Sequence, residues 1–308
     1  MISSNRVKPN ARSSSLENRM RNPSRSAALA LLVLLFVIVG SRAIAKPVSN
    51  EGDVSSMDGV RIHYTLTGHG PIALVFVHGW SCDGTYWKNQ VAAFTPHYRV
   101  VTLDLAGHGQ SGRARKDWTT EAFAHDVQAV VDTLGLRKVV LVGHSMSGPI
   151  CIAASHLMSG RIAAVIGVDT MQDFQLHLTG EQLKPLVGAM QADFRGFVTQ
   201  FVRGLFPAGA DTALVARVAG GMSSAPPDIA IPVFSGIYDY DLKAGIAAAN
   251  VPIREINSDK YPTNLEGNRQ IAKDFKVVVL KGAGHFPQLE RPEEFDAALA
   301  TIVAEVMK

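Results

Sequence analysis

Ser145 lies at an abrupt change in the sequence, where an apolar run gives way to a helical pattern. The run from Lys138 to Val142 stops at Gly143, and small residues follow before the helical pattern. A strand, a tight turn and a helix in succession would place this serine at the apex of the turn. Such a turn strains the serine backbone and needs small neighbours two positions before and after it. The pattern predicts a nucleophilic serine, with Ser147 where the usual G-x-S-x-G has its last glycine.

A serine hydroxyl becomes an effective nucleophile when a base takes its proton and a carboxylate holds that base. His285 lies in a glycine-bounded loop after the last predicted strand, and we expect it to be the base. Asp259 follows the predicted strand Val251–Ile256 and precedes His285 by 26 residues, so it is the expected acid. Asp169 and Asp173, after the preceding predicted strand, are the alternatives.

The same chemistry needs hydrogen-bond donors for the negative oxygen of a tetrahedral intermediate. We expect the backbone N–H of Met146 to be one donor, because it starts the helix after Ser145 and gains from the helix dipole. The backbone N–H of Trp80 is the expected second donor. It lies in the turn that follows the apolar strand Ile72–Val77.

Apolar strand-like runs alternate with helical patterns along most of the chain. The predicted buried strands are 72–77, 98–103, 138–142, 163–168, 251–256 and 276–280. This alternation predicts an α/β fold with a mostly parallel central sheet flanked by helices. Ligands of such sheets bind beyond the carboxyl ends of the strands, which is where Ser145 and its expected partners fall. Residues 171–250 lack strand runs and carry aromatic-rich helical patterns, which predict an inserted helical lid.

The first 45 residues have the composition of a secretory signal peptide. Six basic residues precede the 14 uncharged residues 27–40, and Ala43-Ile-Ala45 follows as a cleavage site. The apolar stretch is short for a membrane span, which needs about 20 residues. We therefore expect a secreted or periplasmic protein. An uncleaved membrane anchor at residues 27–40 is the alternative, and it would be the protein's one contact with a membrane.

The expected division of the chain is a leader at 1–45, a first core segment at 46–170, the lid at 171–250 and a second core segment at 251–308. Removing the leader takes away seven basic residues and one acidic residue, so the formal net charge changes from +3 to −3. The remaining chain has no basic cluster with interleaved aromatic residues, which argues against nucleic-acid binding. Cys82 and Cys151 are expected to be unpaired. No metal-ligand spacing is found, and we expect no cofactor.

Four motifs in this order resemble the α/β-hydrolase fold family over residues 54–308. They are His78-Gly-Trp80, Asp104–Ser111 (DLAGHGQS), Gly143–Gly148 (GHSMSG) and Gly284-His-Phe286. The resemblance implies an α/β-hydrolase core, a lid before the acid, and a Ser-Asp-His triad that works without a cofactor. Dehalogenases and epoxide hydrolases of the same fold use aspartate at the elbow, so Ser145 argues against those activities.

These residues favour a serine hydrolase that cleaves a carboxylic ester, a thioester or a lactone of a small to medium apolar acyl substrate. Two alternatives stay open at this point. A cofactor-free perhydrolase of the haloperoxidase type would use the same triad with peroxide as the acceptor. A ligand-binding or receptor protein on a hydrolase scaffold would bind without turnover, although such proteins usually lose part of the triad.

Overall fold

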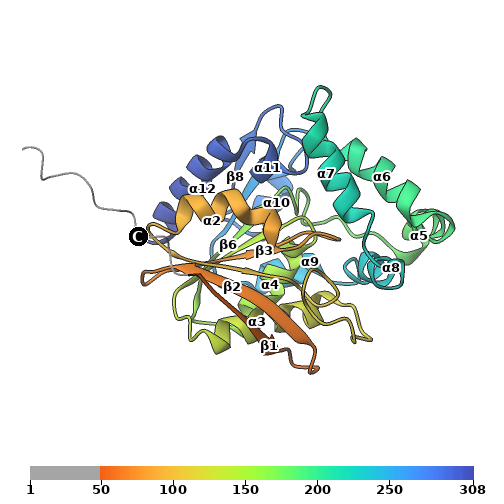
Figure 1. The fold of residues 1–308 in the computed structure, drawn as a ribbon. Coiled ribbons are helices and arrows are strands. Elements are labelled where there is room, and N and C mark those ends of the chain that lie inside the picture. The colour runs from red at the N-terminus through yellow and green to blue at the C-terminus, as the bar shows by residue number, and fades with distance from the viewer. Residues whose placement is uncertain (1–48) are drawn as a thin grey trace, which may run out of the picture. The chain divides into compact units, whose positions relative to one another are not determined.

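The computed structural model describes residues 49–308, so the predicted leader lies outside the described residues. Eight strands form one sheet in the order β1-β2-β4-β3-β5-β6-β7-β8. Figure 1 shows this sheet running through the middle of the described residues. The strands are β1 (Ser49–Ser55), β2 (Arg61–Gly68), β3 (Ala73–Val77), β4 (Arg99–Leu103), β5 (Val139–His144), β6 (Ile162–Val168), β7 (Ile253–Ser258) and β8 (Lys276–Leu280). The pairings of β1 with β2 and of β2 with β4 are antiparallel, and all the others are parallel. The predicted α/β fold with a mostly parallel sheet is confirmed.

Helices connect the strands and cover both faces of the sheet (Figure 1). They are η1 (Gly84–Trp87), α2 (Lys88–Phe94), α3 (Thr120–Thr133), α4 (Ser147–Leu157), α5 (Gly180–Ala192), α6 (Phe194–Leu205), α7 (Thr212–Met222), α8 (Pro227–Gly236), α9 (Leu242–Ala248), α10 (Leu265–Ile271), α11 (Pro287–Glu290) and α12 (Pro292–Val306). The five helices α5–α9 form an insertion between β6 and β7, within the segment predicted to be helical. No helix in the described part of the chain combines the length and apolar character of a membrane span.

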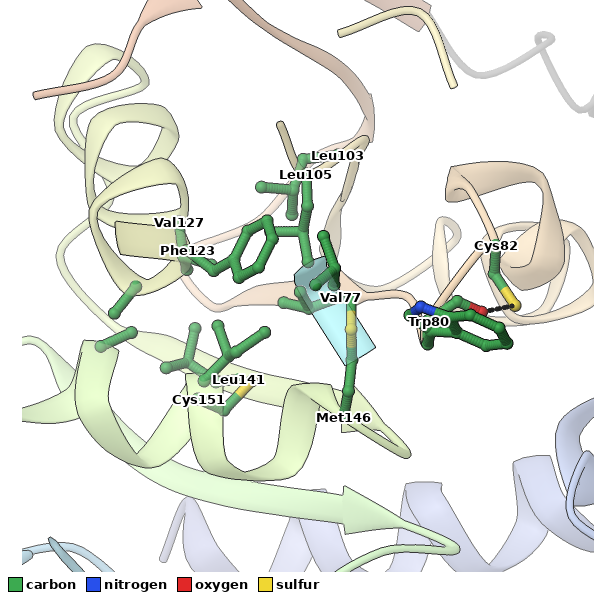
Figure 2. Packing of buried hydrophobic residues seen from close by; sticks show 14 of the residues in the cluster. Val77, Trp80, Cys82, Leu103, Leu105, Phe123, Val127, Leu141, Met146 and Cys151 are labelled. Atoms are coloured by element: carbon green, nitrogen blue, oxygen red, sulfur yellow. Dashed lines mark hydrogen bonds between the residues drawn. The ribbon is translucent and has the colours of Figure 1, made fainter. Parts of the chain in front are cut away.

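The central strands are apolar on both sides because helices cover both faces of the sheet. Successive side chains of a strand point to opposite faces. On β3, Leu74 and Phe76 pack in one cluster with residues of α2 and α12. Val75 and Val77 pack in the other cluster, with residues of α3 and α4. Figure 2 shows Phe123 of α3 and Leu141 of β5 in that second cluster. Burial on both faces holds β3, β5 and β6 in place, so that their carboxyl ends lie side by side at one edge of the sheet.

Both cysteines lie in the core beside these strand ends. Cys82 and Cys151 are buried and unpaired, as predicted. The thiol of Cys82 donates to the carbonyl O of Trp80 at 3.4 Å, in the turn that follows β3 (Figure 2). Burial raises the pKa of both thiols, which makes them poor nucleophiles.

A pair of buried histidines stabilises the loops after β3 and β4. Nε2 of His78 accepts the N–H of Leu105 at 3.0 Å, and its Nδ1–H donates to the carbonyl O of Gly79 at 2.8 Å. The ring of His108 lies 4.9 Å from that of His78, and its Nδ1–H donates to the carbonyl O of Ala106 at 2.9 Å. Burial and the neighbouring His78 lower the pKa of His108 from 6.5 to about 3. Burial lowers the pKa of His78 as well, so both rings are neutral in the folded protein at neutral pH.

This neutrality predicts a loss of stability in acid. The unfolded chain protonates His108 near pH 6.5, whereas the folded chain resists protonation down to about pH 3. The contribution of neutral His108 to the free energy of unfolding is therefore fully present above about pH 6.5. It decreases as the pH falls from about 6.5 to about 3, by about 1.4 kcal/mol per pH unit for one such group. We expect His108→Gln to reduce the slope of unfolding free energy against pH by about that amount. Urea unfolding between pH 6 and 4 measures it, and an unchanged slope would contradict this account.

Candidate active site

Ser145 occupies the sharp turn between β5 and α4. Its backbone has a φ of 54°, in the left-handed region that side chains rarely adopt. Hydrogen bonds hold this conformation from both sides. The N–H of Ser145 donates to the carbonyl O of Val168 at 3.0 Å. Its carbonyl O accepts the hydroxyl of Thr170 at 2.6 Å and the N–H of Gly148 at 3.1 Å. The turn thus presents the Ser145 side chain at the carboxyl end of β5, as predicted.

Close packing around this turn explains its small residues. A Cβ at Gly143 would collide with the carbonyl O of Ser147, and one at Gly148 would lie 2.6 Å from the hydroxyl of Thr170. Ser147 itself is fully buried and fits without displacing the turn. Its hydroxyl donates to the carbonyl O of His78 at 2.5 Å, a contact that the sequence did not indicate.

His285 lies in the loop between β8 and α11, and several contacts fix its backbone. The carboxylate of Glu290 accepts the N–H of Gly284 at 2.9 Å and that of Phe286 at 3.0 Å, on either side of the histidine. Nε2 of the buried His144 lies 2.7 Å from the carbonyl O of His285, so His144 donates there. Burial lowers the pKa of His144 to about 3, which leaves it a neutral donor and a poor base.

One hydrogen-bonded chain joins Ser145, His285 and Asp169. Nε2 of His285 lies 2.9 Å from Oγ of Ser145, and Nδ1 lies 2.6 Å from Oδ2 of Asp169. Because a carboxylate accepts, Nδ1 carries the proton and Nε2 is left to accept from the serine hydroxyl. This geometry can generate a serine alkoxide at the moment of attack on a carbon centre.

The structure contradicts the prediction of Asp259 as the acid, because the carboxylate that contacts His285 is that of Asp169, one of the two alternatives. Asp259 is exposed, and its Oδ1 accepts the N–H of Gly282 at 2.8 Å. The cause is the alternation of side chains at the end of β7. Ser258, the last residue of the strand, points towards Asp169, and the next residue points away. Asp169 follows β6, which pairs directly with the strand that carries the nucleophile.

Asp169 is held as an anion beneath the histidine. Its side chain is fully buried, and its Oδ1 accepts both the N–H of Ser258 at 2.8 Å and the hydroxyl of Ser258 at 2.7 Å. Burial raises the pKa of this carboxyl, but the hydrogen bonds from His285 and Ser258 lower it by more. The pKa therefore lies below its usual 3.8. Ser258 is a partner of the acid that sequence reasoning missed, since a serine at a strand end carries no distinctive signal.

Trp80 and Met146, the expected oxyanion donors, both line the cavity that contains Ser145. Neither backbone N–H makes a hydrogen bond within residues 49–308. Met146 directly precedes α4, so its N–H belongs to the amino-terminal end of that helix. Two such N–H groups in residues that line the same cavity as the Ser145 hydroxyl are suited to receive a negative oxygen.

Backbone strain is concentrated at this site. Among residues 49–308, the non-glycine residues with positive φ are Ser81, Ser145, Asp169 and Met171. All four lie in the turns that follow β3, β5 and β6. Each such conformation costs about 1–3 kcal/mol and persists where the surroundings enforce it, which is common at functional sites.

A cavity of about 560 Å³ opens above Ser145, between the strand ends and the inserted helices. Its wall is largely apolar and aromatic. The indole of Trp80 packs edge-on against Phe234 of α8, with ring centroids 5.4 Å apart, and against Phe201 of α6 at 6.4 Å. Further apolar lining comes from Met146, Leu205, Met222, Ile237 and Phe286. No group of three or more potential metal-ligating side chains occurs in the described part of the chain.

Comparisons with known proteins agree with the fold of this chain. Residues 74–298 match the family model described as the alpha/beta hydrolase family. The strigolactone esterase D14 of Arabidopsis thaliana is 28% identical over 76% of this chain and 92% of that protein. The karrikin insensitive 2 receptor IA of Petunia hybrida is 25% identical over 74% of this chain and 89% of that protein. The solved structure of Est816, described as an N-acyl homoserine lactone degrading enzyme, matches with a TM-score of 0.70. The two sequences are 26% identical, and the match covers 81% of this chain and 99% of that one.

The two acids can be separated by the reactivity of Ser145 towards a fluorophosphonate probe. Asp169→Asn would leave an amide beside Nδ1 and favour the wrong tautomer of His285. We expect labelling to slow by about 10³- to 10⁴-fold, as for triads in general. Asp259→Asn is the matched control and should label within about twofold of the wild-type rate. Equal labelling of the wild type and Asp169→Asn would refute the assignment of the acid.

Proposed function

The chain belongs to the alpha/beta hydrolase family, and from this premise we propose that it is a serine hydrolase of carboxylic esters, thioesters or lactones. The observation that carries the proposal is the hydrogen-bonded chain from Asp169 through His285 to Ser145, which ends at an apolar cavity. Membership of the family establishes a hydrolase. The serine mechanism and the bond that is cleaved are the proposed steps.

In the proposed mechanism, Oγ of Ser145 attacks the carbonyl carbon while Nε2 of His285 takes the proton of the serine hydroxyl. The carbonyl π-electrons move to oxygen, and the N–H groups of Trp80 and Met146 stabilise the resulting oxyanion. The oxyanion collapses, the bond to the leaving oxygen or sulfur breaks, and His285 protonates that atom. Water then attacks the acyl carbon while His285 takes one of its protons. The second oxyanion collapses, the bond from the acyl carbon to Oγ of Ser145 breaks, and His285 returns the proton to Oγ as the acid is released. Asp169 stabilises the imidazolium in both halves.

The cavity supports a small to medium substrate with a mainly apolar acyl group. Its volume of about 560 Å³ falls within the usual range for small-molecule sites. We propose that the helices α5–α9 act as a lid over it, because Phe201 and Phe234 from these helices line its wall. The names of two similar proteins, a strigolactone esterase and an N-acyl homoserine lactone degrading enzyme, are consistent with ester or lactone substrates.

We also propose that residues 1–45 act as a signal peptide that directs export of the protein. Its binding partner would be a small-molecule acyl substrate and not a nucleic acid. Support comes from the leader composition and from the net charge of −3 that remains after cleavage. The mature protein recovered outside the cytoplasm should begin at Lys46. Amino-terminal sequencing would detect this, and membrane-bound protein that still begins at Met1 would favour an anchor.

Turnover of short p-nitrophenyl esters tests the proposed function. The wild type should hydrolyse them, and Ser145→Ala should lose about 10³-fold or more of the rate because the covalent step is removed. Cys151→Ser, a buried change on α4 outside the triad, is the control for folding. If Ser145→Ala keeps its hydrolysis, the proposal fails. Ligand binding with no turnover by the wild type would favour a receptor, and turnover that requires peroxide would favour a perhydrolase.

A further inference from the structure

We propose that Ser147 is a positioning residue that aligns the Trp80 N–H with the nucleophile, an inference that rests on the proposed function. Its hydroxyl donates to the carbonyl O of His78 at 2.5 Å and so joins α4 to the turn after β3. Small size alone would predict that glycine serves equally at this position, as in the usual elbow pattern. The hydrogen bond predicts that it does not.

The hydrogen bonds within the turn after β3 end on the carbonyl O atoms of Gly79 and Trp80 and do not reach α4. The carbonyl O of Gly79 accepts the N–H of Cys82 at 3.1 Å and Nδ1–H of His78 at 2.8 Å. Ser81 within the turn has a φ of 53°, and its buried hydroxyl has no partner in the described structure. These bonds close the turn on itself but do not fix its distance from Ser145.

Besides the bond from the Leu105 N–H to Nε2 of His78, two hydrogen bonds tie this turn to neighbouring helices. The indole N–H of Trp80 donates to the carbonyl O of Ala230 in α8 at 2.8 Å, which links the side chain to the inserted helices. The hydroxyl of Ser147 links the backbone to the nucleophile's own helix. The turn and the elbow are in close contact, since a Cβ at Gly79 would lie 3.3 Å from Cβ of Ser145. Without the Ser147 bond, the turn would lose the hydrogen bond that ties its backbone to α4, and its remaining bonds would hold it to the loop after β4 and to α8 instead.

A misaligned Trp80 N–H would weaken binding of the transition state and not of the substrate. An oxyanion donor acts on charge that develops during the reaction, so its misalignment lowers kcat and leaves substrate binding nearly unchanged. Removing the Ser147 hydroxyl would also leave the buried carbonyl O of His78 without this partner. Acylation and deacylation both pass through an oxyanion, so either rate-limiting step would report the change.

Ser147→Ala tests this inference, with Ser155→Ala as the matched control. Ser155 is a buried serine on the same helix, and its hydroxyl donates within α4 to the carbonyl O of Ile152 at 2.7 Å. With p-nitrophenyl butyrate, we expect Ser147→Ala to lower kcat about 10-fold with KM within about twofold. The inhibition constant of a trifluoromethyl ketone transition-state analogue should rise by the same factor. Ser155→Ala should leave all three values within about twofold.

Unchanged kcat and inhibition constant in Ser147→Ala would overturn the inference, as would a similar loss in Ser155→Ala. A rise in KM alone would indicate a substrate contact and also overturn it. The proposed function is judged separately, by wild-type turnover and its loss in Ser145→Ala. Should the wild type turn over no ester, the rate of fluorophosphonate labelling replaces kcat, because the phosphonyl oxygen uses the same donors. Labelling of Ser147→Ala should then be about 10-fold slower, and equal rates would contradict the inference.

Discussion

The strained backbone of Ser145 is the constraint on which the rest of the site depends. At a φ of 54°, the residue cannot hold its position unaided, and the surroundings supply the restraint. Gly143 and Gly148 leave room for close packing, and the hydroxyl of Thr170 caps the Ser145 carbonyl O at 2.6 Å. The result is a side chain that stands clear of its own backbone at the floor of the cavity. Every other feature of the site is positioned relative to that hydroxyl.

The turn after β6 serves the nucleophile and the acid together. Asp169 and Met171 both have positive φ, and Thr170 between them holds the elbow. The N–H of Thr170 donates to Oδ1 of Asn257 at 3.3 Å, so β7 supports this turn as well. Because β6 lies beside β5, a carboxylate at its end can contact the same histidine that contacts Ser145. The turn after β6 therefore both supports the backbone of Ser145 and places the carboxylate of Asp169 against His285.

The sequence allowed the sheet, the elbow and the base to be predicted, because each depends on local pattern. Ser145 and His285 follow strands that are clear from their apolar runs alone. The acid could not be chosen in this way. Asp169 and Asp259 follow neighbouring strands, and the outcome depended on which side chain of β7 faces inward at its last residue. The bond from Ser147 to His78 joins residues 69 positions apart and requires the folded packing to become visible.

The central claim is that catalysis proceeds through an acyl group on Ser145. The most direct test is to quench the enzyme during turnover of p-nitrophenyl butyrate and to map modified peptides by mass spectrometry. The account predicts a butyryl group on the peptide that contains Ser145, accumulating within one turnover and disappearing as substrate is exhausted. Turnover with no acyl adduct, or with the adduct on Cys82 or another residue, would contradict it.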